Sequence, residues 1–138
     1  MAQTIHRGFK TLLDEANREV EAIKAPDLIA SVKDENILIV DLRDPREIER
    51  EGRIPGAFHC PRGMLEFWLD PASPYAKPAF QQDKKFVFHC ASGWRSALAA
   101  KTAQDMGLKP VAHLDGGFTA WREAGGPIER VEPHKPKT

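Results

Sequence analysis

Two short apolar runs constrain the fold of this 138-residue chain more than any other feature. Residues 37–42 read ILIVDL and residues 84–90 read KKFVFHC. Their length and their β-branched and aromatic content are typical of strands buried on both faces. The apolar spacing of 11–23 favours an amphipathic helix, and the small residues of 96–107 favour a second helix. Alternating strands and helices predict an α/β fold in which helices cover both faces of a parallel sheet.

Weaker patterns complete this alternation. They predict a short helix in 25–36, a charged helix in 44–52, a turn that leads into a strand in 54–61, a strand in 110–114, and a closing helix in 118–126. Residues 61–80 are broken by prolines and are expected to form a structured loop that could face a partner. The length fits one domain. We expect an N-terminal amphipathic helical extension over 1–25, the domain over 26–130, and a disordered polar tail over 131–138.

Composition excludes several classes of protein. Twenty basic residues balance twenty acidic ones, so the chain offers no electrostatic footprint for nucleic acid or an anionic membrane. The two cysteines, Cys60 and Cys90, lack the paired spacing of a disulfide framework or a structural zinc site. Free thiols indicate a reducing compartment. Because the sequence also shows no signal-type or membrane-spanning apolar stretch, we expect a cytoplasmic protein.

The stretch that follows the second apolar run indicates a reactive thiol. Cys90 stands at the carboxyl end of a predicted parallel strand, where ligands bind in such folds. The backbone N–H groups of a tight loop and of the following helix would form a cradle for an anion there. Gly93 permits the close turn, and Ser96 is expected to cap the helix. A buried core cysteine is the alternative, but a glycine-bearing turn with an arginine at its exit is not needed for packing. We therefore predict a nucleophilic Cys90 in an anion-binding loop made of Ala91, Ser92, Gly93, Trp94, Arg95 and Ser96.

Three motifs together resemble one protein family. Residues 90–96, CASGWRS, resemble the active-site loop of rhodanese-type sulfurtransferases. Residues 40–57, VDLRDPREIEREGRIPGA, resemble the first motif of that family, and residues 116–127, GGFTAWREAGGP, resemble its last. The resemblance implies a central parallel five-stranded sheet with helices on both sides. The chain departs from the usual pattern at Arg53, where a histidine commonly precedes IPGA.

The resemblance also implies a reaction. A sulfane sulfur would pass from thiosulfate or a persulfide donor to Cys90, and from the Cys90 persulfide to a thiophilic acceptor, either a cellular thiol or a protein. No metal or organic cofactor would be needed.

Several charged residues have two open interpretations. Arg95 suits the oxygens of a sulfonate or sulfate, and equally suits a structural ion pair with Asp41 at the end of the first strong strand. Arg43 and Arg62 could approach the mouth of the site, although each is expected to be a solvated surface charge. These three residues, Asp41, Arg43 and Arg62, are the candidates for pocket or loop support.

Other residues near the loop are assigned to structure. His89 should point to the face opposite Cys90 and act as a satisfied core histidine, not as a general base. Cys60 could resolve a persulfide as a disulfide, but a packed strand-end cysteine is favoured. Asp115 is expected to cap the last helix, with Gly116 and Gly117 allowing a close approach to the loop. Trp94 would line the pocket, meet a protein partner, or pack against Trp68 or Phe67.

Two other functions compete with sulfur transfer. A cysteine phosphatase or arsenate reductase also has a loop that opens with His-Cys and closes with Arg, but that loop carries five residues between cysteine and arginine. Here four residues intervene, and a smaller ring of N–H groups suits a single sulfur better than a phosphoryl group. A non-catalytic sulfur-carrier or binding module is the second competitor, because folds of this kind can persist without chemistry.

Overall fold

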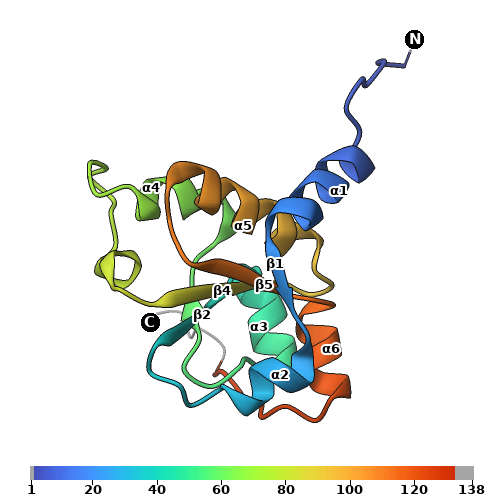
Figure 1. The fold of residues 1–138 in the computed structure, drawn as a ribbon. Helices are drawn as coiled ribbons and strands as arrows, with labels where there is room; N and C mark the ends of the chain where they lie inside the picture. The colour runs from blue at the N-terminus through green and yellow to red at the C-terminus, as the bar shows by residue number, and fades with distance from the viewer. Residues whose placement is uncertain (1, 133–138) are drawn as a thin grey trace, which may run out of the picture.

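The computed structural model describes residues 2–132, which contain one five-stranded sheet (Figure 1). The strand order is β1-β5-β4-β2-β3, and all neighbouring strands pair in parallel. The strands are β1 (Glu21–Ile23), β2 (Ile37–Asp41), β3 (Phe58–His59), β4 (Lys85–His89) and β5 (Val111–Leu114). Because the strands are parallel, their carboxyl ends share one edge of the sheet. The predicted α/β class with a five-stranded parallel sheet is confirmed.

Helices cover both faces of the sheet. In Figure 1, α1 (Phe9–Glu19), α4 (Leu65–Leu69) and α5 (Trp94–Met106) lie above it, and α2 (Ala25–Ala30), α3 (Pro45–Glu51) and α6 (Gly117–Glu123) lie below it. Two short 3₁₀ turns, Arg62–Met64 and Pro78–Gln81, flank α4. None of the helices within residues 2–132 is long and apolar enough to cross a lipid bilayer.

The two faces of β4 explain its continuous apolar run. Phe86 and Phe88 pack in one core cluster beneath α4 and α5, whereas Val87 packs in the other cluster against α2 and α6. Side chains alternate along a strand, so His89 and Cys90 leave the end of β4 toward opposite faces.

The N-terminal segment differs from its predicted form. The helix expected over 11–23 ends at Glu19, because Val20 adopts an extended conformation, and Glu21–Ile23 form the edge strand β1 against β5. Hydrogen bonding to β5 outweighs the helical spacing of these few residues. The sheet therefore begins before residue 26, within the segment assigned to the extension. α1 itself packs on α5, where Leu13 and Ala16 contact Ala97.

The C-terminal segment is tied to the domain as far as Glu129. Arg53 and Glu129 exchange two backbone hydrogen bonds of 2.9 Å as an antiparallel bridge, and their side chains form an ion pair at 2.6 Å. The arginine that departs from the family pattern thus holds this segment. The predicted disordered tail lies mostly outside the described residues, since residues 133–138 are not among them.

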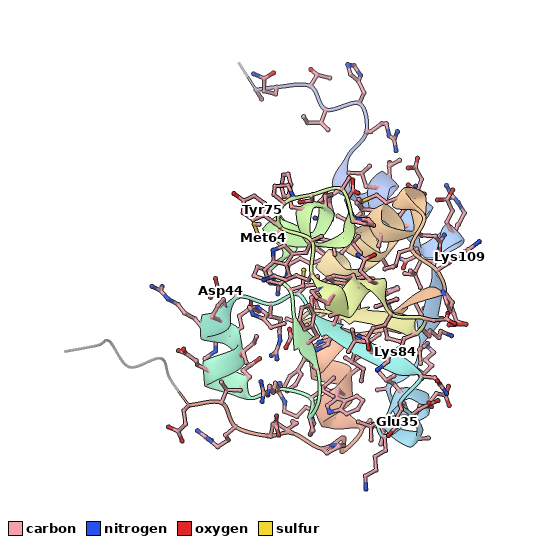
Figure 2. The ribbon with its side chains drawn as sticks, turned by 90° about the vertical axis from the view of Figure 1, so that its left-hand side faces the viewer. Glu35, Asp44, Met64, Tyr75, Lys84 and Lys109 are labelled. Atoms are coloured by element: carbon pink, nitrogen blue, oxygen red, sulfur yellow. The ribbon has the colours of Figure 1, made fainter. Side chains whose placement is uncertain are left out.

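The two edges of the sheet carry different loops. In Figure 2, Asp44, which follows β2, lies on the left, while Lys84 and Lys109, which precede β4 and β5, lie on the right. The segment 61–80 buries Leu65, Leu69 and Phe80 in the core and exposes Tyr75, which is labelled in the upper part of Figure 2. This segment is a structured part of the domain, as predicted, and it contributes to the core.

Candidate active site

Cys90 lies at the carboxyl edge of the sheet, immediately after β4. Its Sγ accepts hydrogen bonds from the backbone N–H groups of Gly93 at 3.2 Å and Ser96 at 3.4 Å. Gly93 has a φ of +106°, a left-handed conformation that suits glycine, and it stands directly before α5. Cys90 is only 1% exposed, so the two N–H groups act on its sulfur in a largely desolvated setting. Both N–H dipoles therefore direct their positive ends at the sulfur.

The first turn of α6 holds the loop through backbone hydrogen bonds. The N–H of Phe118 donates to the Cys90 carbonyl at 2.8 Å, and the N–H of Thr119 donates to the Ala91 carbonyl at 3.1 Å. Gly117 has a φ of +60°, and a Cβ there would lie 2.6 Å from the Cys90 carbonyl oxygen. Glycine is therefore required for this close approach.

The predicted capping role of Asp115 is wrong. Gly116 occupies the N-cap position of α6, and the Asp115 carboxylate pairs with Lys24 at 2.8 Å. Because Cys90 and Ala91 already accept from the first N–H groups of α6, no side-chain cap is needed.

Ser96 also differs from its predicted role. Gly93 is the N-cap residue of α5, so Ser96 lies inside the first turn and cannot cap the helix. Its side chain is fully buried, with Oγ 3.3 Å from the Gly93 carbonyl oxygen and 3.2 Å from Nδ1 of His113. It is the backbone of Ser96 that reaches the sulfur.

Arg95 forms an ion pair, with a partner that the sequence did not indicate. Its guanidinium donates to both carboxylate oxygens of Glu47, at 2.8 and 2.9 Å. Glu47 is held in turn by the N-cap of α3, where the N–H of Asp44 donates to it at 3.0 Å. The hydrogen bond from Arg95 lowers the pKa of Glu47 to about 2, so this carboxylate remains charged at neutral pH. The pair ties the loop to α3.

The predicted partner of Arg95, Asp41, is bonded to Arg43 instead. Nε and Nη2 of Arg43 donate to the Asp41 carboxylate at 3.0 and 2.8 Å, and Nη2 also donates to the Gly52 carbonyl. The Arg43 side chain is fully buried, with its guanidinium 4.1 Å from the centre of the Phe118 ring. Burial acts to raise the pKa of Asp41, but the hydrogen bonds and charge of Arg43, with His89, lower it.

Arg43 and Arg62, both predicted to be solvated surface charges, differ in burial. Arg43 is not a solvated charge, because the carboxylate at the end of β2 compensates its burial. Arg62 is a surface charge, as predicted, and pairs with Glu66 at 2.9 Å one helical turn away.

His89 is buried on the face opposite Cys90, as the strand alternation predicts. Its Nδ1 lies 3.3 Å from the Cys90 carbonyl oxygen, and its Nε2 lies 3.6 Å from the Asp41 carboxylate. Nε2 has no hydrogen-bond partner within residues 2–132, so the expected full satisfaction of this ring is wrong. Burial lowers the pKa of His89, which favours the neutral ring.

Cys60 is a packed cysteine. It is fully buried in the core cluster that contains Phe88, and burial raises the pKa of its thiol to about 12. Cys60 and Cys90 follow His59 and His89, which both pair with Asp41, so two strand spacings separate them. That distance is about 10 Å, beyond the ~7 Å between Cα atoms that a disulfide allows.

Trp94 is 59% exposed at the start of α5. Its ring packs against Phe9 of α1, with 5.2 Å between ring centres, and not against Trp68 or Phe67, which is one of the three roles considered for it. The N-terminal helix therefore borders the candidate site.

Sequence reasoning missed three residues connected to the loop: Glu47, His113 and Asn17. The D-x-x-E pattern of Asp44 to Glu47 is a helix-start signal that marks Glu47 as a fixed carboxylate. His113 and Asn17 carry no comparable local signal. Within the described part of the chain, no three His, Cys, Asp or Glu side chains are grouped so that they could hold a metal ion.

The comparisons with known proteins agree with one another. A family model described as Rhodanese-like domain matches residues 24–124. A sulfurtransferase of Allochromatium vinosum is 34% identical over 98 residues, which cover 71% of this chain and 83% of that protein. A putative sulfurtransferase of Bacillus subtilis, YtwF, is 34% identical over 88 residues, 64% of this chain and 76% of that protein.

Among solved structures, a Rhodopseudomonas palustris protein described as of unknown function and as a possible tyrosine phosphatase is 69% identical. It superposes with a TM-score of 0.91 over 94% of this chain and 99% of its own. A rhodanese-related protein of Thermoplasma volcanium is 28% identical, with a TM-score of 0.63 over 79% of this chain and 97% of its own. This chain belongs to the rhodanese-like domain family.

Proposed function

We propose that this protein is a sulfurtransferase that carries a sulfane sulfur as a persulfide on Cys90. The observation that carries this proposal is the convergence of the Gly93 and Ser96 N–H groups on Sγ at the carboxyl edge of a rhodanese-like sheet. Relatives named as sulfurtransferases support the same reaction class.

In the first half-reaction the Cys90 thiolate attacks the outer sulfur of thiosulfate. The S–S bond of the donor breaks, its electron pair leaves with sulfite, and a new bond joins Sγ to the transferred sulfur. A persulfide donor reacts in the same way, with a thiolate as the leaving group. The loop N–H groups stabilise the persulfide anion that results.

In the second half-reaction a thiophilic acceptor attacks the outer sulfur of the persulfide. The Sγ–S bond breaks and its electron pair returns to Cys90 as the thiolate. Cyanide would leave as thiocyanate, and a cellular or protein thiolate would leave as a persulfide. No external oxidant or reductant enters either step, and the chemistry suits a reducing, cytoplasmic setting in which both cysteines remain free thiols.

A phosphatase is the second candidate, favoured by the description of the R. palustris relative. Two features weigh against it. Only four residues separate Cys90 from Arg95, and the charge of Arg95 is already compensated by the carboxylate of Glu47.

An assay of thiocyanate formed from thiosulfate and cyanide tests the proposal. Cys90→Ser is expected to abolish thiocyanate formation, and Cys60→Ser, the matched control, to retain it. Hydrolysis of p-nitrophenyl phosphate is measured on the same proteins. Phosphate release that depends on Cys90, without thiocyanate formation, would reverse the order of the two candidates.

A further inference from the structure

Three polar side chains form a continuous hydrogen-bonded chain from α1 to the candidate active-site loop. Nε2 of His113, on β5, lies 3.2 Å from Oδ1 of Asn17, on α1. Nδ1 of His113 lies 3.2 Å from Oγ of Ser96, on α5, and the N–H of Ser96 donates to Cys90 Sγ at 3.4 Å. The series of hydrogen bonds therefore reaches the sulfur through the backbone N–H of Ser96.

The direction of these hydrogen bonds follows from the groups that make them. Oδ1 of Asn17 only accepts, so Nε2 of His113 carries the proton and donates. Burial lowers the pKa of His113, which favours a neutral ring with Nδ1 as an acceptor. The Ser96 hydroxyl therefore donates to Nδ1 of His113.

This geometry links both donors that act on Cys90. Ser96 supplies one N–H group directly, and Gly93, the residue that supplies the other, is held in the same turn because its carbonyl accepts from the N–H of Ala97 at 3.1 Å. Because the Ser96 side chain is fully buried and lies against His113, the first turn of α5 is held in one rotation about its axis. In that rotation the N–H of Ser96 points at Sγ.

Asn17, the outermost side chain of this hydrogen-bonded series, lies outside the residues that match the family model. The family match begins at residue 24, whereas Asn17 belongs to α1, which ends at Glu19. Asn17 is exposed, while α1 is anchored separately by Leu13 and Ala16 against Ala97. Asn17 can therefore be replaced without removing the contacts that hold α1.

We propose that His113 is a positioning residue for the sulfur transfer proposed above, and that Asn17 keeps its ring in the tautomer that this role requires. His113 acts through the Ser96 hydroxyl, which keeps the N–H of Ser96 directed at the reacting sulfur. The inference rests on the proposed function, since its effect is on the step in which Cys90 attacks the donor.

A set of substitutions at position 113 tests this role. His113→Leu removes the acceptor for Ser96, and we expect kcat for thiosulfate to fall about three- to tenfold with KM changed less than about twofold, the scale of one hydrogen bond. His113→Asn places a side-chain oxygen near the position of Nδ1 and should restore most of kcat. Ser96→Ala should lower kcat as His113→Leu does, and the double variant should lose no more than either single one. Independent losses that multiply in the double variant, or equal losses in His113→Leu and His113→Asn, would overturn the proposal.

Asn17 provides a surface variant if His113→Leu fails to fold. Asn17→Leu should lower kcat in the same sense. Gln104→Leu is the matched control, because it removes a different hydrogen bond to α1, from Gln104 of α5 to the Glu19 carbonyl, that does not touch the loop. Equal losses in Asn17→Leu and Gln104→Leu would show that general packing of α1 is responsible, and would also contradict the proposal.

A second readout separates this inference from the proposed function. The rate of alkylation by iodoacetamide is measured in a Cys60→Ser background, where only Cys90 reacts. It should fall in His113→Leu and recover in His113→Asn. If the unmodified protein forms no persulfide but the alkylation rates follow this order, the proposed function fails and the positioning role stands. If persulfide forms, and neither kcat for thiosulfate nor the rate of alkylation responds to substitution at position 113, the positioning role alone fails.

Discussion

Gly117 lies against the backbone of Cys90, so that a Cβ at position 117 would come within 2.6 Å of the Cys90 carbonyl oxygen. Gly117→Ala should therefore displace the loop and lower sulfur transfer at least tenfold. It should also destabilise the protein by more than the ~1–2 kcal/mol that a left-handed alanine costs. Urea unfolding and thiocyanate formation measure the two effects.

Gly125 is the matched control for that substitution. It has a φ of +81°, but a Cβ there would meet nothing within 4 Å. Gly125→Ala should cost only the ~1–2 kcal/mol of the backbone conformation and leave activity unchanged. Equal activity in the two variants would show that the contact between α6 and the loop is not needed.

Arg43→Met tests the buried ion pair beneath the site. The substitution leaves the Asp41 carboxylate buried without its partner, and we expect a loss of about 3–5 kcal/mol in the free energy of unfolding. Arg53→Met, which breaks the half-exposed pair with Glu129, should cost less than ~1 kcal/mol. A loss for Arg43→Met as small as that for Arg53→Met would mean that the pair contributes little.

The features that could be read from the sequence are those that depend on neighbouring residues. The apolar runs that form β2 and β4 predict buried strands. The loop was also predictable, because Cys90, Gly93 and the helix that follows lie within a few positions of one another. The residues that could not be placed depend on distant contacts. Arg95 and Glu47 are 48 positions apart, and His113 and Asn17 are 96 apart.

Arg43 and β1 show the same limit. The burial of Arg43 follows from a nearby carboxylate at a strand end together with the ring of Phe118, which is remote in sequence. The strand β1 is only three residues long, and its partner β5 is supplied from the far end of the chain. A local sequence pattern shows neither the contact of Arg43 with Phe118 nor the pairing of β1 with β5.

Glu47→Gln tests how the charge of Arg95 acts on an anionic donor. Glutamine can still accept from the N–H of Asp44, so α3 should begin as before, but Arg95 would no longer be neutralised. We expect KM for thiosulfate to fall about two- to fivefold at low salt, an effect below ~1 kcal/mol, and to return at high salt.

Glu35→Gln makes the same change in net charge before β2, at the other edge of the sheet. It should leave KM for thiosulfate unaltered. A similar fall in both variants would attribute the effect to net charge and not to Arg95.

The buried histidines predict how stability depends on pH. Burial lowers the pKa values of His89 and His113 below the ~6.5 of an unfolded histidine. The unfolded chain therefore takes up protons first as the pH falls, so the stability from these groups is complete above about pH 6.5 and is lost below it. Urea unfolding at pH 7.5 and 5.5 measures the loss.

His113→Gln removes one of the two groups and should reduce the difference in stability between these pH values. His6→Gln, which removes an exposed imidazole, is the control. An undiminished difference in His113→Gln would contradict the prediction for His113.

The central claim is that Cys90 accepts a single sulfur atom and holds it among the loop N–H groups. The most direct measurement is the intact mass of the protein after exposure to thiosulfate, with peptide mapping of the added mass before and after cyanide. We expect one added sulfur, located on Cys90 and removed by cyanide. An unmodified Cys90, or sulfur that is found on Cys60 instead, would contradict it.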